Sequence, residues 1–107
     1  MVDKEGALKK THDFLLELKK MGVTVQAAYL FGSYAEDKQH EWSDIDLALF
    51  SDQFTGFGFD DKKDMAHINI RKEFVDIEVK TFPIQVIDNP DPFVKQIFSK
   101  GIKLISK

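Results

Sequence analysis

Apolar and polar residues near the start of the chain repeat with the period of a helix. Leu8, Leu15, Leu18 and Met21 fall on one face, and pairs of lysines occupy the other. Gly22 follows Met21, the last of these apolar residues, and a glycine in this position is typical of a helix C-terminus. The pattern predicts an amphipathic helix that packs on a core through its apolar face.

Four later segments have the composition of strands. Residues 23–31 are rich in β-branched and aromatic side chains, which predicts a buried central strand, and residues 45–50 form a second apolar run. Residues 74–82 alternate between apolar and charged positions, as a strand with one buried face does. Residues 102–105 can add one further short strand. We expect these segments to form a sheet.

Two more helices are expected in the second half of the chain. One is predicted over roughly residues 60–70, although its last positions fit a helix poorly. The other begins after Asp91, an N-cap residue followed by Pro92 at the first helical position, and it ends at Gly101. Both helices would pack on the sheet.

Residues 51–60 lack a sustained period, which predicts a loop. Its phenylalanines, Phe54, Phe57 and Phe59, would either form a lid or docking patch or fold back onto the core, and both interpretations stay open. The expected order is helix, strand, strand, helix, strand, helix, strand. This order predicts a single α/β (or α+β) domain over residues 1–107, with a mixed β-sheet and helices packed on it.

The composition narrows the classes of function. The chain has 107 residues, enough for one compact domain. A net charge of −3, with Arg71 as the only arginine, argues against direct binding of nucleic acid. The lack of cysteine excludes disulfides and thiolate metal sites, and no apolar run approaches the ~20 residues of a membrane span. We therefore expect a cytoplasmic protein that does not contact a membrane.

A glycine turn follows the first predicted strand, at Phe31-Gly32-Ser33. Ser33 and Glu36 have the spacing of a capping box, which predicts a short helix beginning at Ser33. The N–H groups at a helix start can bind phosphate, and glycine leaves room for its approach. The alternative is an ordinary capped helix after a tight turn.

Acidic residues stand at alternate positions in two of the predicted strands. Asp44 and Asp46 would lie on one face, roughly 6.5–7 Å apart along the backbone. In so apolar a run they favour a cation between them, and Mg²⁺ prefers carboxylate oxygens. Asp76 and Glu78 form a second pair of this kind. For both pairs the alternative is a solvent-facing row of charges.

Together these features resemble the nucleotidyltransferase superfamily that includes polymerase beta, in its minimal, single-domain form. The resemblance rests on the spacing from Gly32 and Ser33 to Asp44 and Asp46 in the run SDIDLALF, followed by a third acid on a later strand. It implies the polymerase beta-like nucleotidyltransferase fold. It also implies that Gly32 and Ser33 bind the β- and γ-phosphates of a nucleoside triphosphate.

The resemblance further implies an Mg²⁺-dependent transferase. The expected reaction moves a nucleoside monophosphate, AMP from ATP, to a hydroxyl acceptor. Asp44, Asp46 and Asp76 would be the catalytic, metal-binding residues and would hold two Mg²⁺ ions, with Glu78 as the alternative third acid. Such catalysis consists mainly of positioning and charge neutralisation.

The chain departs from the family pattern directly after Ala35, which matches a small residue of the motif. Glu36 and Asp37 stand where the family usually has a basic residue and then a glycine. Their negative charge should weaken the binding of a triphosphate, although Lys38 offsets it in part. This departure concerns activity, not fold.

Single-domain proteins of this kind lack a second domain that selects an acceptor. The resemblance implies a HEPN-type helical protein as partner, with the present chain as the antitoxin that adenylylates a tyrosine of that partner. The alternative is a non-catalytic binding module that neutralises a partner by contact alone. A homo-oligomer is a further option, because a second copy could supply an acceptor pocket.

Overall fold

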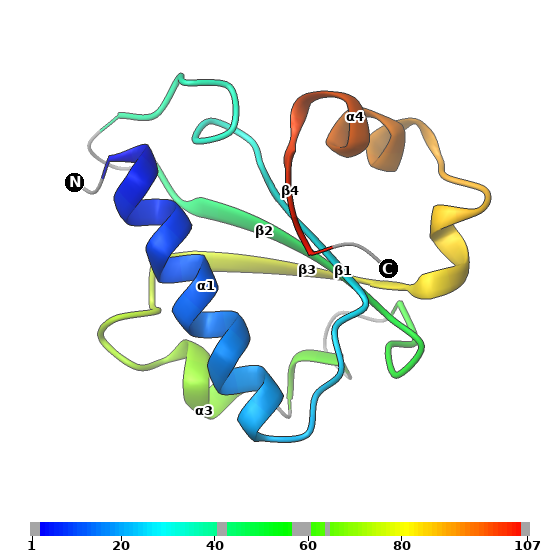
Figure 1. Ribbon diagram of the computed structural model, residues 1–107, viewed down its shortest axis with the longest axis horizontal. Coiled ribbons are helices and arrows are strands. Elements are labelled where there is room, and N and C mark those ends of the chain that lie inside the picture. Colours follow the sequence, from blue (N-terminus) through cyan, green and yellow to red (C-terminus); the bar gives the residue numbers. More distant parts are fainter. Residues whose placement is uncertain (1–2, 41–42, 57–60, 64, 106–107) are drawn as a thin grey trace.

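A computed structural model describes residues 3–40, 43–56, 61–63 and 65–105 of the protein. Its core is a four-stranded sheet with the order β3-β2-β1-β4, and helices lie on both of its faces (Figure 1). The elements are α1 (Lys4–Lys20), β1 (Ala27–Phe31), β2 (Ile45–Ser51), α3 (Ala66–Asn69), β3 (Ile77–Pro83), the 3₁₀ helix η1 (Ile84–Ile87), α4 (Pro92–Lys100) and β4 (Ile102–Ile105).

The sheet is mixed, as the sequence predicts. β1 pairs antiparallel with both β2 and β4, whereas β2 and β3 run parallel. The parallel pair is joined by a crossover that includes α3, since parallel strands need a long connection. Strands β1 and β2 are therefore the two central strands, and the prediction of a buried central strand is confirmed for β1.

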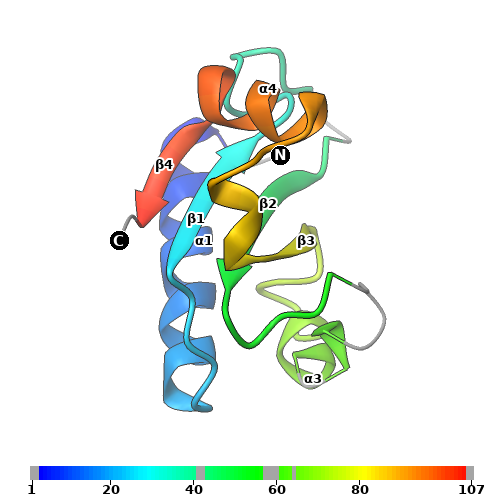
Figure 2. The ribbon, with the colours of Figure 1, turned by 90° about the vertical axis from the view of Figure 1, so that its right-hand side faces the viewer.

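Different helices cover the two faces of the sheet (Figure 2). On one face, Phe14 and Leu18 of α1 pack in a core that includes Leu30 and Leu47. On the other face, α4 and η1 pack in a second core that includes the ring of Phe50. Residues of each strand alternate between these two cores, which fixes the face toward which each acidic side chain of β2 and β3 points.

The first and last predicted helices are confirmed, and their starts have side-chain caps. The Asp3 side chain accepts a hydrogen bond from the Gly6 N–H at 2.7 Å at the start of α1. Asp91 does the same for the Val94 N–H at 2.9 Å at the start of α4. Such caps satisfy N–H groups that have no partner within the helix.

Three elements are shorter than the sequence predicts. β1 begins at Ala27 rather than at residue 23, because side chains bind the backbone of Thr24: its C=O accepts from Ser51 Oγ and its N–H donates to Gln53 Oε1 at 2.9 Å. β3 begins at Ile77, because a turn bond to the Phe74 carbonyl holds its N–H. The predicted helix over residues 60–70 is α3, confined to Ala66–Asn69, with one short helical turn at residues 61–62.

The loop after β2 is held to the core at two points. Phe54 is buried, so this phenylalanine folds back onto the core; Phe57 and Phe59 lie outside the described residues. Asp61 accepts hydrogen bonds from the N–H groups of Thr55 and Gly56 and from the Thr81 hydroxyl, at 2.8–2.9 Å. Burial raises the pKa of Asp61, but these hydrogen bonds outweigh it and hold the pKa below its usual range.

Candidate active site

The turn after β1 is shaped by a glycine with a left-handed backbone. Gly32 has φ +72°, a conformation that side-chain-bearing residues rarely adopt. The chain then makes hydrogen-bonded turns, with Glu36 N–H donating to the Gly32 carbonyl at 3.2 Å. The expected helix at Ser33 is wrong: Asp37 has φ 58°, so the helical path ends after a single turn.

Gly32 lies directly against the carboxylate of Asp46. The antiparallel register places Phe31, the last residue of β1, opposite Asp46 of β2. A Cβ built on Gly32 would overlap Asp46 Oδ2. Gly32 and Asp46, which are 14 positions apart in the sequence, are therefore in contact. Only a residue without a side chain fits at position 32.

Asp46 shares its face of the sheet with Glu78. The parallel register pairs these two residues, while their neighbours Ile45 and Ile77 lie in the core beneath α1. Asp44 and Asp76 directly precede the two strands, and the Ile45 N–H donates to the Asp76 carbonyl at 2.9 Å. The structure thus brings all four acidic residues to the beginning of the β2–β3 pair.

The electrostatic surroundings of Asp46 are unfavourable for a negative charge. Burial, followed by the charges of Glu78 and Asp44, raises the pKa of Asp46 to about 6, and Lys80 only partly opposes this. Among the described residues, the Asp46 side chain has no hydrogen bond or ion pair. A carboxylate in this state favours a cation next to it.

Asp76 is paired with a lysine of a distant helix, whereas Glu78 lies 3.8 Å from Lys80 of its own strand. Lys10 of α1 donates to both carboxylate oxygens of Asp76, at 3.0 and 3.1 Å, and the pair is partly buried. No local pattern in the sequence indicates this contact, since 66 positions separate the two residues. The Lys10 ammonium therefore supplies positive charge directly beside the Asp76 carboxylate.

Three of the acids line one hollow. Asp44, Asp76 and Glu78 surround a space of about 280 Å³ together with Lys62, a residue that belongs to none of the sequence motifs. Within the described residues, no group of three His, Cys, Asp or Glu side chains stands ready around a single metal position. The carboxylate oxygens and the uncompensated charge of Asp46 nevertheless suit a hard divalent cation such as Mg²⁺.

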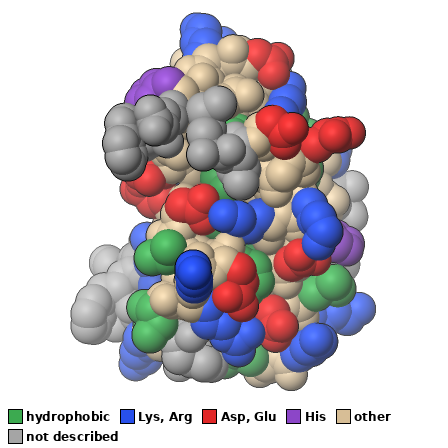
Figure 3. Space-filling model, turned by 90° about the vertical axis from the view of Figure 1, so that its left-hand side faces the viewer, with side chains coloured by type: hydrophobic (Ala, Val, Ile, Leu, Met, Phe, Trp, Pro, Cys, Tyr) green, Lys and Arg blue, Asp and Glu red, His purple; other side chains and the backbone are tan. Residues whose placement is uncertain are grey.

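The two acids that depart from the family pattern both have lysine partners. Lys4 lies 3.1 Å from Asp37, and Lys38 lies 3.8 Å from Glu36. Figure 3 shows this end of the molecule, where acidic and basic side chains alternate on the surface. The negative charge beside the glycine turn is therefore partly neutralised by the chain itself.

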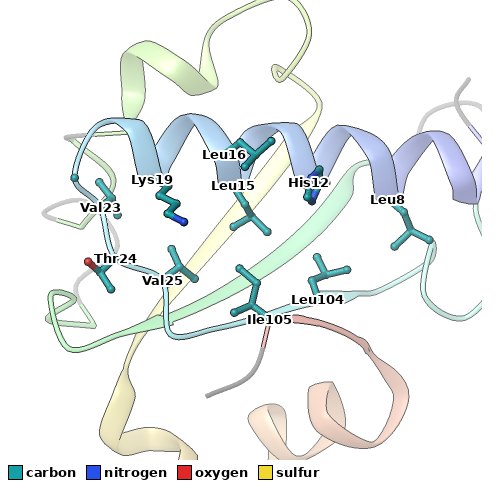
Figure 4. Close-up of a pocket in the computed structure, with 11 residues that line it drawn as sticks. Leu8, His12, Leu15, Leu16, Lys19, Val23, Thr24, Val25, Leu104 and Ile105 are labelled. Atoms are coloured by element: carbon teal, nitrogen blue, oxygen red, sulfur yellow. The ribbon is translucent and has the colours of Figure 1, made fainter.

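A larger hollow lies away from the acids, between α1 and β4 (Figure 4). Its volume is about 630 Å³, and its lining is mostly apolar, with Leu15, Val25 and Ile105 among its residues and His12 and Lys19 as its charged or titratable groups. None of the acids of the glycine-turn site lines it. Its chemistry suits an apolar surface of another molecule rather than a nucleotide.

A mixed sheet that holds a glycine turn against a strand carboxylate, with further acids beside it, is the arrangement expected of a nucleotidyltransferase domain. The family model described as polymerase beta, nucleotidyltransferase, matches residues 14–107. The chain belongs to this family. The resemblance read from its sequence is therefore confirmed, and nucleotidyl transfer is the activity that defines the family.

Two solved structures share the fold. A candidate nucleotidyltransferase from Sulfolobus solfataricus has a TM-score of 0.67 and 17% identity, with 94% of this chain and 80% of that chain covered. A mutant of the toxin–antitoxin pair MntA–HpeT has a TM-score of 0.54 and 19% identity, with 90% and 73% covered. No curated protein matches the chain significantly. Identities this low establish the fold alone.

None of the helices in the described residues has the length and apolar character that crossing a bilayer requires.

Proposed function

We propose that this protein transfers AMP from ATP to a hydroxyl group, with Mg²⁺ as cofactor. The observation that carries the proposal is the contact between the Gly32 backbone and the Asp46 carboxylate. This contact supports a site for phosphates directly beside a site for a cation. A nucleoside triphosphate bound to Mg²⁺ needs a phosphate site and a cation site next to each other.

The residues would divide the work as follows. Backbone N–H groups at Gly32 and Ser33 would bind the terminal phosphates, because Gly32, at φ +72°, has no side chain to block their approach. Asp44 and Asp46 would hold Mg²⁺, which when bound neutralises phosphate charge and lowers the pKa of the acceptor hydroxyl. The acceptor oxygen forms a bond to the α-phosphorus, the bond to the β-phosphate oxygen breaks, and pyrophosphate leaves.

The third carboxylate would accept the proton of the acceptor hydroxyl. The family resemblance favours Asp76 for this role, whereas the register places Glu78 next to Asp46. We propose Asp76, which Lys10 holds at the edge of the acidic hollow. Glu78 then contributes mainly to the negative field around Asp46.

Substitution of the two acids distinguishes these roles. We expect Asp76→Asn to abolish Mg²⁺-dependent transfer and Glu78→Gln to reduce it by about 10–100-fold, as loss of a supporting group does. Lys10→Met is the matched control, because it removes the lysine partner of Asp76 and leaves every carboxylate in place. Initial rates with labelled ATP measure all three. Full activity of Asp76→Asn would move the role to Glu78.

The acceptor is proposed to be a tyrosine of a helical, HEPN-type partner protein, with this chain as the antitoxin in the cytoplasm. The structural neighbour MntA–HpeT is itself a toxin–antitoxin pair. The apolar hollow between α1 and β4 supports a protein partner, since an apolar surface of this size suits a protein contact. The lack of cysteine fits the reducing cytoplasm.

A non-catalytic binding module is the second candidate. It is favoured by the Lys10–Asp76 pair and by the large hollow that lies apart from the acids. Incubation with labelled ATP, Mg²⁺ and the protein encoded by the neighbouring gene separates the two functions. Label on the partner supports the transferase, whereas tight association without label supports the binding module.

A further inference from the structure

A small hollow of about 210 Å³ lies between the glycine turn and α4. The turn contributes Gly32 and Glu36, and α4 contributes Phe93, Gln96 and Lys100. Figure 2 shows α4 and this turn together at one end of the sheet. The hollow thus includes the glycine that touches Asp46, and two of its polar side chains, Gln96 and Lys100, come from a helix outside the sequence motif.

Both ends of α4 are fixed against the end of β1. The ring of Phe93 packs edge-to-face on Phe31, with centroids 5.8 Å apart. At the other end, a Cβ on Gly101 would stand 3.0 Å from the Leu30 carbonyl oxygen, so the backbones pack closely there. Lys100, the residue before Gly101, is therefore anchored at the hollow by its backbone while its side chain stays exposed.

Lys100, an exposed residue that lines the hollow, has a side chain without a partner among the described residues. Among the described residues, Lys100 makes no ion pair or hydrogen bond through its side chain, whereas Glu36 has Lys38 at 3.8 Å. The Gln96 side chain likewise has no partner in this set. The turn contains the acidic residues Glu36 and Asp37. An anion bound at Gly32 would therefore need positive charge from another element, and Lys100 of α4 provides it.

We propose that this hollow binds the β- and γ-phosphates of the nucleoside triphosphate, with Lys100 Nζ and the Gln96 amide as donors. The inference rests on the proposed function and adds two residues to it. A space of about 210 Å³ is smaller than the ~300–1,000 Å³ of a complete small-molecule site, so it suits part of a nucleotide. The nucleoside lies outside the hollow.

Binding measurements test this assignment independently of turnover. Calorimetry with ATP, pyrophosphate and AMP, each with Mg²⁺, is applied to the wild type and to Lys100→Gln. We expect the variant to bind ATP and pyrophosphate about tenfold more weakly, as loss of one charge-assisted contact predicts, and to bind AMP unchanged. Lys100→Arg should retain the wild-type ratio of ATP to AMP affinity.

Lys95→Gln is the matched control, because Lys95 is an exposed lysine of the same helix that does not line the hollow. It should bind all three ligands as the wild type does. Wild-type ATP affinity in Lys100→Gln would overturn the inference, and so would an equal loss for all three ligands, which indicates a distorted helix. A wild type that binds none of the three ligands would overturn the proposed function itself.

Discussion

Replacement of Asp46 by asparagine is expected to abolish nucleotide transfer and, at neutral pH, to stabilise the fold. Transfer is lost because the variant lacks the carboxylate closest to the glycine turn. The loss should exceed the ~10–100-fold that removal of a supporting residue causes. Stability rises because Asp46 is half-buried beside Glu78 and Asp44 and carries a charge that they disfavour.

The pH dependence of the stability gained by Asp46→Asn follows from the direction in which the pKa of Asp46 is shifted. The folded-state pKa of about 6 lies above the ordinary 3.8, so the native state binds the Asp46 proton more tightly than the unfolded state does. The charge therefore destabilises the fold fully above pH 6, and the effect disappears as the pH falls below 3.8. The advantage of Asp46→Asn should disappear over the same interval.

Thermal unfolding measures this effect. At neutral pH we expect the Tm of Asp46→Asn to exceed that of the wild type by about 4–8 °C, or about 1 kcal/mol, because a half-buried group keeps part of its hydration. Asp52→Asn, at an exposed aspartate, is the control and should change neither Tm nor transfer. Addition of Mg²⁺ should raise the Tm of the wild type only. A less stable or fully active Asp46→Asn variant would contradict this account.

Gly32→Ala is expected to damage the site more than the fold. The alanine Cβ would meet both an unfavourable φ of +72° and the Asp46 carboxylate. The backbone conformation alone should cost about 1–2 kcal/mol of unfolding free energy. Displacement of Asp46 by about 1 Å should lower transfer by roughly 10²-fold.

Gly22→Ala separates these two effects. Gly22 has φ +84°, but a Cβ added there would meet nothing within 4 Å, so this variant imposes the backbone strain without a collision. The two variants should therefore unfold at similar denaturant concentrations and differ in rate. If Gly32→Ala transfers nucleotide as fast as Gly22→Ala, the Gly32–Asp46 contact has no part in catalysis.

Those parts of the fold that depend on local patterns could be predicted from the sequence. The strand around Asp46 follows from an apolar run, the strand around Glu78 follows from alternation, and α4 follows from its cap and its glycine. The helix expected at Ser33 failed because one left-handed residue, Asp37, decides whether the turn continues. A capping box cannot reveal the conformation of a residue beyond it.

The contacts between distant segments could not be predicted in the same way. The Lys10–Asp76 pair depends on how α1 lies across the sheet, and the hollow at Lys100 depends on how α4 packs on β1. No short motif encodes either position. The acids of the site could be identified from their spacing along the chain, but the lysines around them required the tertiary structure.

The parallel pairing of β2 and β3 also determines which changes in length the site tolerates. A slip of one residue in β3 would exchange Glu78 for an apolar neighbour beside Asp46 and would turn charged side chains into the core beneath α1. Insertions in the crossover before β3 leave this register intact. We therefore expect natural or engineered variants to gain and lose residues in the crossover, and to keep the spacing within the two strands fixed.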